Sequence, residues 1–98
     1  MESLRKHPDQ TDVVVYSKDY CPYCVAAKNL LTQKGVGFEE IDVQNDQAAY
    51  DDMLKKVAPR RTVPQIFIGG LGIGGYDDMK KLDAEGKLDV LLFPTKRP

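Results

Sequence analysis

Both cysteines of the chain stand in one tetrapeptide, Cys21-Pro22-Tyr23-Cys24, and this spacing constrains the chain more than any other feature. The tetrapeptide follows the apolar run 13–16 and precedes a segment with helical periodicity. Two thiols separated by two residues lie about one helical turn apart, so the second can attack a disulfide that the first has formed. In this strand-to-helix context the motif predicts thiol–disulfide exchange.

The position of the motif predicts different roles for the two sulfur atoms. Pro22 suits the first turn of a helix because it lacks an N–H group and its φ is already helical. Cys21 would then lie at the helix N-terminus, where unpaired N–H groups and the helix dipole favour a thiolate. We expect Cys21 to be the exposed nucleophile and Cys24, one turn inside, to be the resolving thiol. A stabilised thiolate is also a good leaving group, which favours turnover by an external thiol.

Two structural explanations of the motif are weaker. A zinc site needs about four ligands, whereas the chain has two thiols and one histidine, His7, which stands in a polar N-terminal stretch. We expect no metal site, and we interpret His7 as a solvated residue. A static disulfide across two residues would close too short a loop to add much stability.

Length and composition limit the remaining possibilities. A chain of 98 residues, 42% of them hydrophobic, forms one small domain with one core. The net charge of −1 from 14 basic and 15 acidic residues gives no electrostatic signature of nucleic-acid binding. We find neither the apolar stretch of a signal peptide in residues 1–12 nor a run of about 20 apolar residues that would span a membrane. We therefore predict a cytoplasmic protein in which the cysteines stay reduced. Since one core uses the apolar faces, we expect a monomer.

Apolar periodicity predicts an alternation of strands and helices in the order βαβαββα. The expected strands cover residues 12–17, 37–43, 65–68 and 71–73. The expected helices cover 22–34, the segment from a cap at Asn45 or Asp46 to Pro59, and a region from Gly74 that Gly86 interrupts before a last short helix. A helical crossover makes the first two strands parallel, and a Gly69-Gly70 hairpin turn makes the last two antiparallel. We expect a domain over 12–93, with flexible ends at 1–11 and 94–98.

Three motifs in this order, namely Cys21-Pro22-Tyr23-Cys24, Thr62-Val63-Pro64 and Gly74-Gly75-Tyr76-Asp77-Asp78, carry a family resemblance. Over residues 12–93 the sequence resembles a dithiol (CPYC-type) glutaredoxin of the thioredoxin-like superfamily. The resemblance implies an α/β, three-layer fold with a four-stranded mixed sheet flanked by helices. It also implies a cis peptide bond between Val63 and Pro64.

The resemblance further implies that the three motifs form one site for glutathione. The backbone of Val63 would pair with the cysteinyl part of glutathione, and the N–H groups of Asp77 and Asp78 would donate to its γ-glutamyl carboxylate. The Asp78 carboxylate would take the ammonium, although ordinary helix capping also explains an aspartate there. The residues expected to bind glutathione are Lys18, Tyr23, Arg60, Thr62, Val63, Pro64, Gly75, Tyr76, Asp77 and Asp78.

Some details of this site stay open. Lys18 and Arg60 are expected to face the glycine carboxylate, and the adjacent Arg61 leaves undecided which arginine does so. Tyr76 stands where many relatives have a small residue, which would narrow the γ-glutamyl end. Pro64 also has an ordinary explanation as a proline at a strand edge.

The function that follows is that of a glutathione-dependent enzyme with Cys21 and Cys24 as its catalytic residues. It would reduce protein disulfides and protein–glutathione mixed disulfides, with glutathione as co-substrate, glutathione reductase as an indirect partner and no tightly bound cofactor. Two alternatives remain: a redoxin reduced by thioredoxin reductase, and an iron–sulfur carrier in which two chains and two glutathiones share a cluster. The charged residues of the expected site disfavour the first alternative. Pro22 and Cys24 disfavour the second.

Overall fold

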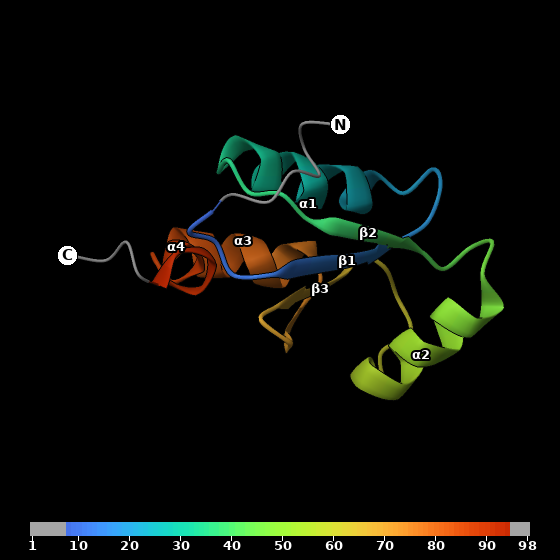
Figure 1. Cartoon of the computed structure of the whole chain (residues 1–98). Helices are drawn as coiled ribbons and strands as arrows, with labels where there is room; N and C mark the ends of the chain where they lie inside the picture. The colour runs from blue at the N-terminus through green and yellow to red at the C-terminus, as the bar shows by residue number, and fades with distance from the viewer. Residues whose placement is uncertain (1–7, 95–98) are drawn as a thin grey trace.

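The computed structural model describes residues 8–94, so His7, most of the predicted N-terminal extension and residues 95–98 lie outside the description (Figure 1). Along the chain the elements are β1 (Val13–Ser17), α1 (Pro22–Gln33), β2 (Glu39–Asp42), α2 (Gln47–Val57), β3 (Gln65–Ile68), β4 (Leu71–Gly74), α3 (Tyr76–Ala84) and α4 (Leu88–Leu92). The order is the predicted one, with the last short helix as α4.

A four-stranded mixed sheet in the order β2-β1-β3-β4 forms the middle of the molecule. β1 is parallel to β2 and antiparallel to β3, and β3 is antiparallel to β4. The predicted α/β, thioredoxin-like fold is confirmed. The order places the C-terminal end of β1 beside the N-terminal end of β3, where Tyr16 pairs with Gln65. This edge of the sheet therefore brings the segment after β1 close to the segment before β3.

Alternating side chains of the strands pack into two apolar clusters, one on each face of the sheet. Val13 and Val15 point into the larger cluster, with residues of α1, α3 and α4 such as Leu31, Met79 and Leu88. Tyr16 lies on the opposite face, in a smaller cluster with Met53 of α2. In Figure 1, α2 accordingly lies apart from the other three helices.

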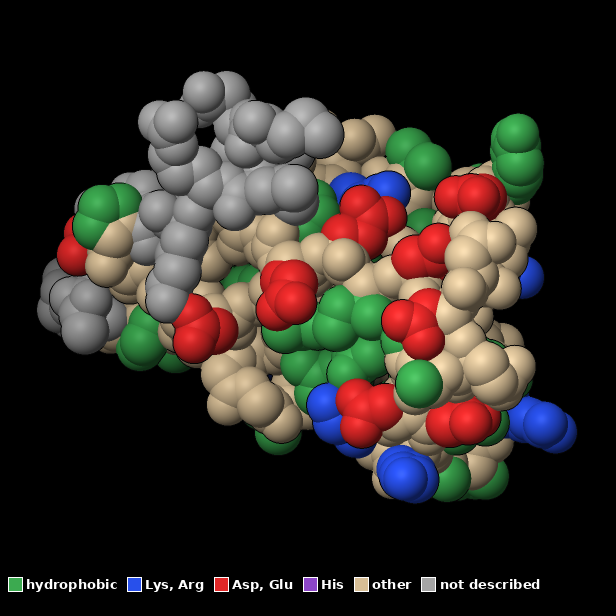
Figure 2. Space-filling model, turned by 45° about the vertical axis from the view of Figure 1, so that its right-hand side comes forward, with side chains coloured by type: hydrophobic (Ala, Val, Ile, Leu, Met, Phe, Trp, Pro, Cys, Tyr) green, Lys and Arg blue, Asp and Glu red, His purple; other side chains and the backbone are tan. Residues whose placement is uncertain are grey.

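The sheet face that carries the smaller cluster is only partly covered by α2. A hollow of about 710 Å³ remains beside the helix, and its apolar wall includes Val14, Tyr16, Ile41 and Phe67. Figure 2 shows hydrophobic side chains gathered in a patch on this side of the molecule, with charged side chains, both acidic and basic, around them. The larger cluster, in contrast, is enclosed by three helices, so most of the apolar core lies on that side of the sheet.

The element boundaries follow local chemistry except where distant residues intervene. Of the two predicted caps of α2, Asp46 is the one used, since its carboxylate accepts the N–H of Ala49 at 3.1 Å. β2 was predicted from Gly37 but begins at Glu39. The reason is that the side chain of Gln10 binds both the N–H and the C=O of Gly37, at 2.8 and 2.7 Å.

Gln10 and Thr11 correct the predicted extent of the N-terminal extension. Gln10 is 7% exposed, and Thr11 bonds to α4 through its backbone N–H and its hydroxyl, each at 2.8 Å. These two residues are thus part of the folded domain, although 1–11 was predicted to be flexible. Within residues 8–94, no helix has the length and apolar character needed to cross a membrane.

Candidate functional site

Cys21 is the N-cap of α1, as predicted, and Pro22 is the first residue of the helix. The Cys21 sulfur accepts a hydrogen bond from the backbone N–H of Cys24, with Sγ 3.2 Å from the nitrogen. An N–H group directed at sulfur, together with the helix dipole, stabilises negative charge on that sulfur. Both cysteines are free thiols. The helix start therefore presents a sulfur atom suited to nucleophilic attack on a disulfide.

The predicted exposure of Cys21 is wrong, because the residue is only 7% exposed. Its thiol lies 3.8 Å from the carbonyl oxygen of Val63, to which it donates. Val63 precedes β3, which is adjacent to β1, so the sheet order brings this carbonyl to the cysteine. Reaction at Cys21 must therefore take place beside the Val63 backbone.

Cys24 lies deeper, at 1% exposure. Burial, and then the side-chain hydrogen bond with Cys21, raise the pKa of the Cys24 thiol to about 12. The backbone N–H of Lys18 and the positive charge of Lys28 act in the opposite direction. A thiol with this pKa stays protonated near neutral pH, so Cys24 is not the thiolate that begins an exchange.

The peptide bond between Val63 and Pro64 is cis, as the resemblance implied, and a second cis bond joins Ala58 to Pro59. Gln65, which is 1% exposed, donates through Nε2 to the carbonyl oxygen of Thr62 at 3.0 Å. This buried amide connects the first residue of β3 to the preceding loop. The loop is thereby held beside α1 with its backbone directed toward Cys21.

A hollow of about 240 Å³ lies between this loop and the start of α3. We call it the Pro64 hollow, and its lining residues are Tyr23, Arg60, Thr62, Val63, Pro64, Gly75, Tyr76, Asp77 and Asp78. These are nine of the ten residues that the sequence predicted to bind glutathione. Three segments far apart in the chain thus meet at one concave surface.

Lys18, the tenth predicted residue, lines an adjoining hollow of about 320 Å³. Arg61 lines the same hollow, whose wall also includes Thr62 and Val63. Lys18 and Arg60 thus line different hollows that adjoin at Thr62 and Val63, and the expectation that both face one carboxylate stays a prediction. Arg61, which the sequence left undecided, is the arginine that shares a hollow with Lys18.

Arg60 instead pairs with Asp78, with Nη1 3.0 Å from Oδ2. The same carboxylate oxygen accepts the N–H of Gly75 at 2.9 Å, as a residue capping α3 does. The Gly75 N–H, and then Arg60, hold the pKa of the Asp78 carboxyl below its usual range. The ordinary capping role is thus present, and Asp78 already has Arg60 as a cationic partner.

Tyrosine side chains border the Pro64 hollow. The rings of Tyr23 and Tyr76 are 6.3 Å apart between centroids and inclined by 30°. Tyr76 therefore lies close to Tyr23, the aromatic residue of the CxxC motif. Its expected narrowing of the γ-glutamyl end of the site stays a prediction. Tyr20, which precedes Cys21, has φ 55° and a side chain that is 99% exposed, and it is not part of the hollow's lining.

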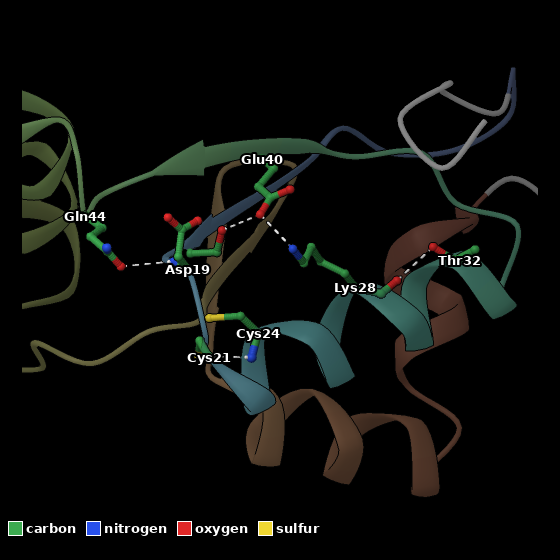
Figure 3. Close-up of polar contacts among 8 residues, drawn as sticks. Asp19, Cys21, Cys24, Lys28, Thr32, Glu40 and Gln44 are labelled. Carbon is green, nitrogen blue, oxygen red and sulfur yellow. Dashed lines mark hydrogen bonds and ion pairs between the residues drawn. The ribbon is translucent and has the colours of Figure 1, made fainter. Parts of the chain in front are cut away.

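Sequence reasoning missed a polar cluster on the strand side of α1 (Figure 3). Glu40 of β2 accepts from Lys28 at 2.8 Å and from the buried Ser17 hydroxyl at 2.6 Å. No sequence signal connects residues so far apart. Among residues 8–94, no three His, Cys, Asp or Glu side chains lie close enough together to hold a metal ion.

Comparison with known proteins agrees with this geometry. The sequence profile of the glutaredoxin family matches residues 13–73. Glutaredoxin 3 of Escherichia coli (strain K12) is 49% identical over 81 residues, which cover 83% of this chain and 96% of that protein. Glutaredoxin 1 of Rickettsia prowazekii (strain Madrid E) is 46% identical over 81 residues, covering 82% of this chain and 85% of the relative.

Solved structures show the same similarity. The solution structure of glutaredoxin from Brucella melitensis has a TM-score of 0.77 and 43% identity. The match covers 94% of this chain and 100% of the Brucella chain. The crystal structure of a buckwheat glutaredoxin–glutathione complex has a TM-score of 0.76 and 36% identity, with 84% and 76% of the two chains covered.

Proposed function

The chain belongs to the glutaredoxin family and is a thiol–disulfide oxidoreductase, and from this premise we propose that glutathione is its electron donor. The enzyme reduces protein disulfides and protein–glutathione mixed disulfides. Glutathione reductase serves it indirectly, by regenerating glutathione. It acts as a monomer in the cytoplasm, without a tightly bound cofactor.

The Pro64 hollow is the observation that carries this proposal. Its lining combines backbone donors and acceptors, a cation and carboxylates beside Cys21. Glutathione is an extended anion with two carboxylates and one ammonium, so it needs backbone pairing in the middle and charged contacts at its ends. The buckwheat glutaredoxin to which this chain is similar is described as a complex with glutathione.

Binding follows from the positions of these groups. The Val63 backbone pairs with the cysteinyl part and aligns its sulfur with Cys21. The N–H groups of Asp77 and Asp78 at the start of α3 receive the γ-glutamyl carboxylate. The ion pair between Arg60 and Asp78 opens when the ligand binds. Arg60 then contacts a carboxylate of glutathione, and Asp78 contacts its ammonium. Lys18 and Arg61 in the adjoining hollow attract the other carboxylate.

With a glutathionylated protein, Cys21 alone completes the reaction. Its thiolate attacks the sulfur of the glutathione moiety, and the protein leaves as a thiolate that takes a proton from water. A second glutathione thiolate then attacks the sulfur of the glutathione held on Cys21. The products are glutathione disulfide and the Cys21 thiolate, so each turnover consumes one free glutathione, and the other half of the glutathione disulfide comes from the adduct.

With a protein disulfide, the exchange also needs Cys24. Cys21 attacks one sulfur atom of the disulfide and forms a mixed disulfide with the protein. Cys24 then loses its proton and attacks Cys21, which releases the reduced protein and leaves a Cys21–Cys24 disulfide. Two glutathiones reduce that disulfide in turn.

The test is turnover of a small glutathione mixed disulfide with glutathione, glutathione reductase and NADPH. We expect NADPH consumption that depends on the enzyme and saturates with the mixed disulfide, and no activity in Cys21→Ser. A parallel assay replaces the glutathione system by thioredoxin reductase. Faster reduction of the enzyme by thioredoxin reductase than by glutathione would overturn the proposed electron donor.

A further inference from the structure

A single carboxylate oxygen organises the polar cluster behind Cys24. Oε2 of Glu40 accepts the Ser17 hydroxyl at 2.6 Å and the Lys28 ammonium at 2.8 Å. Ser17 is 1% exposed, whereas the side chains of Lys28 and Glu40 are 27% and 36% exposed. The lysine is therefore held against the protein by a carboxylate that a buried hydroxyl fixes in place.

This cluster faces the resolving thiol rather than the attacking one. Lys28 follows Cys24 by four residues on α1, and residues four apart lie on the same face of a helix. Figure 3 shows the Cys24 side chain and the Lys28 ammonium on the side of α1 that faces the strands, with Glu40 above them. Cys21 lies at the helix terminus, one turn before Cys24.

We propose that Lys28, held by Glu40, is a positioning residue for the resolving step and stabilises the Cys24 thiolate as it attacks the mixed disulfide on Cys21. The inference rests on the proposed dithiol function. In this step Cys24 gives its proton to solvent, and its sulfur bonds to that of Cys21. The bond between Cys21 and the substrate sulfur breaks, and the substrate leaves with the electron pair as a thiolate.

The resolving step needs such help because Cys24 is almost fully buried. Besides burial, the groups that act on its sulfur belong to α1 and to the loop before it. In the reduced protein Cys21 at the helix start disfavours the thiolate, whereas the backbone N–H of Lys18 and the charge of Lys28 favour it. In the mixed disulfide Cys21 has neither a proton nor a charge, so the effects of Lys18 and Lys28 remain. Glu40 of β2 acts through Lys28, to which it is bonded. Lys28 is thus the one of these groups whose side-chain charge favours the thiolate.

Glu40 suits the role of holder because it stays ionised near neutral pH. Burial opposes ionisation, but the hydrogen bonds from Lys28 and Ser17 outweigh it and keep the pKa of Glu40 below its usual range. A lysine on a helix surface otherwise extends into water, where its charge is screened. The bond to Glu40 keeps the ammonium close to the helix face that carries Cys24.

The experiment separates the two chemical steps without using glutathione. The reduced protein is mixed with excess of an aromatic disulfide whose released thiolate is coloured, and absorbance is followed by stopped flow. The first equivalent of thiolate reports attack by Cys21 and depends on the disulfide concentration. The second equivalent reports attack by Cys24 on Cys21. Because this step is intramolecular, its rate does not depend on the disulfide concentration. The protein is compared with Lys28→Met, Lys28→Arg and Glu40→Gln.

We expect Lys28→Met to slow the second phase about threefold near neutral pH, because one partly screened charge acts across the helix face. The pH midpoint of that phase should rise, the effect should shrink in high salt, and Lys28→Arg should restore the rate. The first phase should be unchanged, which also shows that the variant is folded. Glu40→Gln should slow the second phase in the same direction.

Other results would overturn the inference. A second phase that is insensitive to Lys28→Met, or an equal slowing of both phases, would show that Lys28 has no specific role in resolution. A faster second phase in Glu40→Gln would mean that the carboxylate opposes the thiolate rather than holding the lysine. If the unaltered protein gave no second phase, the dithiol route itself would fail, and the inference with it.

Discussion

Arg60 and Asp78 are joined by an ion pair in which Nη1 lies 3.0 Å from Oδ2, and this contact connects the loop before β3 to the start of α3. Asp78 Oδ2 also accepts the N–H of Gly75 at 2.9 Å. The two charges lie on the wall of the Pro64 hollow. A ligand that carries both an ammonium and carboxylates therefore meets a cation and an anion that already balance each other.

Replacing Arg60 by glutamine should affect glutathione binding more than the same change at Arg61. Arg60 lines the Pro64 hollow, whereas Arg61 lines the adjoining one. A partly exposed arginine–carboxylate contact is worth about 1 kcal/mol, so we expect the KM for glutathione to rise about fivefold in Arg60→Gln. Steady-state kinetics of both variants give the comparison. A larger rise in Arg61→Gln would place the main carboxylate contact beside Lys18.

Gly74→Ala should disturb both stability and glutathione binding. Gly74 has φ +104°, and a Cβ there would collide with the Asp78 carboxylate and the Arg60 guanidinium. Gly35 is a matched control, since it has φ +75° and a methyl group added there would meet no described atom within 4 Å. Positive φ costs alanine about 1–2 kcal/mol at Gly35 and more at Gly74, whose φ lies beyond the left-handed helical region, and the collision should add about 1 kcal/mol or more at Gly74.

Urea unfolding and KM measurements together check this prediction. Gly35→Ala should lower the free energy of unfolding but leave the KM for glutathione unchanged. Equal losses of stability in the two variants, with no change of KM in either, would show that the Arg60–Asp78 pair tolerates an added methyl group.

Variants of the two cysteines should have different effects on deglutathionylation and on the reduction of protein disulfides. Cys21→Ser should lower both activities at least about a thousandfold, because the serine hydroxyl is not ionised near neutral pH. Cys24→Ser should keep deglutathionylation and lose most of the reduction of protein disulfides, for which its sulfur is needed. Assays of both substrates with each variant test this, and equal loss of both activities in the two variants would contradict the assigned roles.

The Lys28–Glu40 pair predicts a dependence of stability on pH. Because the folded-state pKa of Glu40 is lowered, its contribution is fully present above the unfolded value of about 4.3 and is lost as the pH falls through the folded value. Between about pH 6 and pH 3, the free energy of unfolding should therefore fall less in Glu40→Gln than in the unaltered protein. The side chain is 36% exposed, so solvent screening limits the difference to less than about 1 kcal/mol.

Urea unfolding across this pH range measures the difference. Glu39→Gln, an exposed neighbour on the same strand, is the matched control for removing one negative charge. Parallel curves for the unaltered protein and Glu40→Gln would show that the pair adds no stability.

Local signals in the chain explain why most of the fold was predictable. Pro22 begins α1, Asp46 caps α2, and Gly69 and Gly70 both have positive φ at the hairpin turn. Each of these depends on the residue's own backbone preferences or on neighbours within one turn. The start of β2 was misplaced because Gln10, 27 residues away, takes both hydrogen bonds of Gly37.

The sequence by itself determined the chemistry, since two thiols one turn apart at a helix start suffice for disulfide exchange, and its three motifs indicated the family. Only the tertiary structure decided that Cys21 is covered by the Val63 loop, that Arg60 pairs with Asp78, and that Lys18 lies in the other hollow. The physical reason is that exposed charges and loop backbones have weak local preferences. Their positions are set by partners that the sheet order brings together from distant parts of the chain.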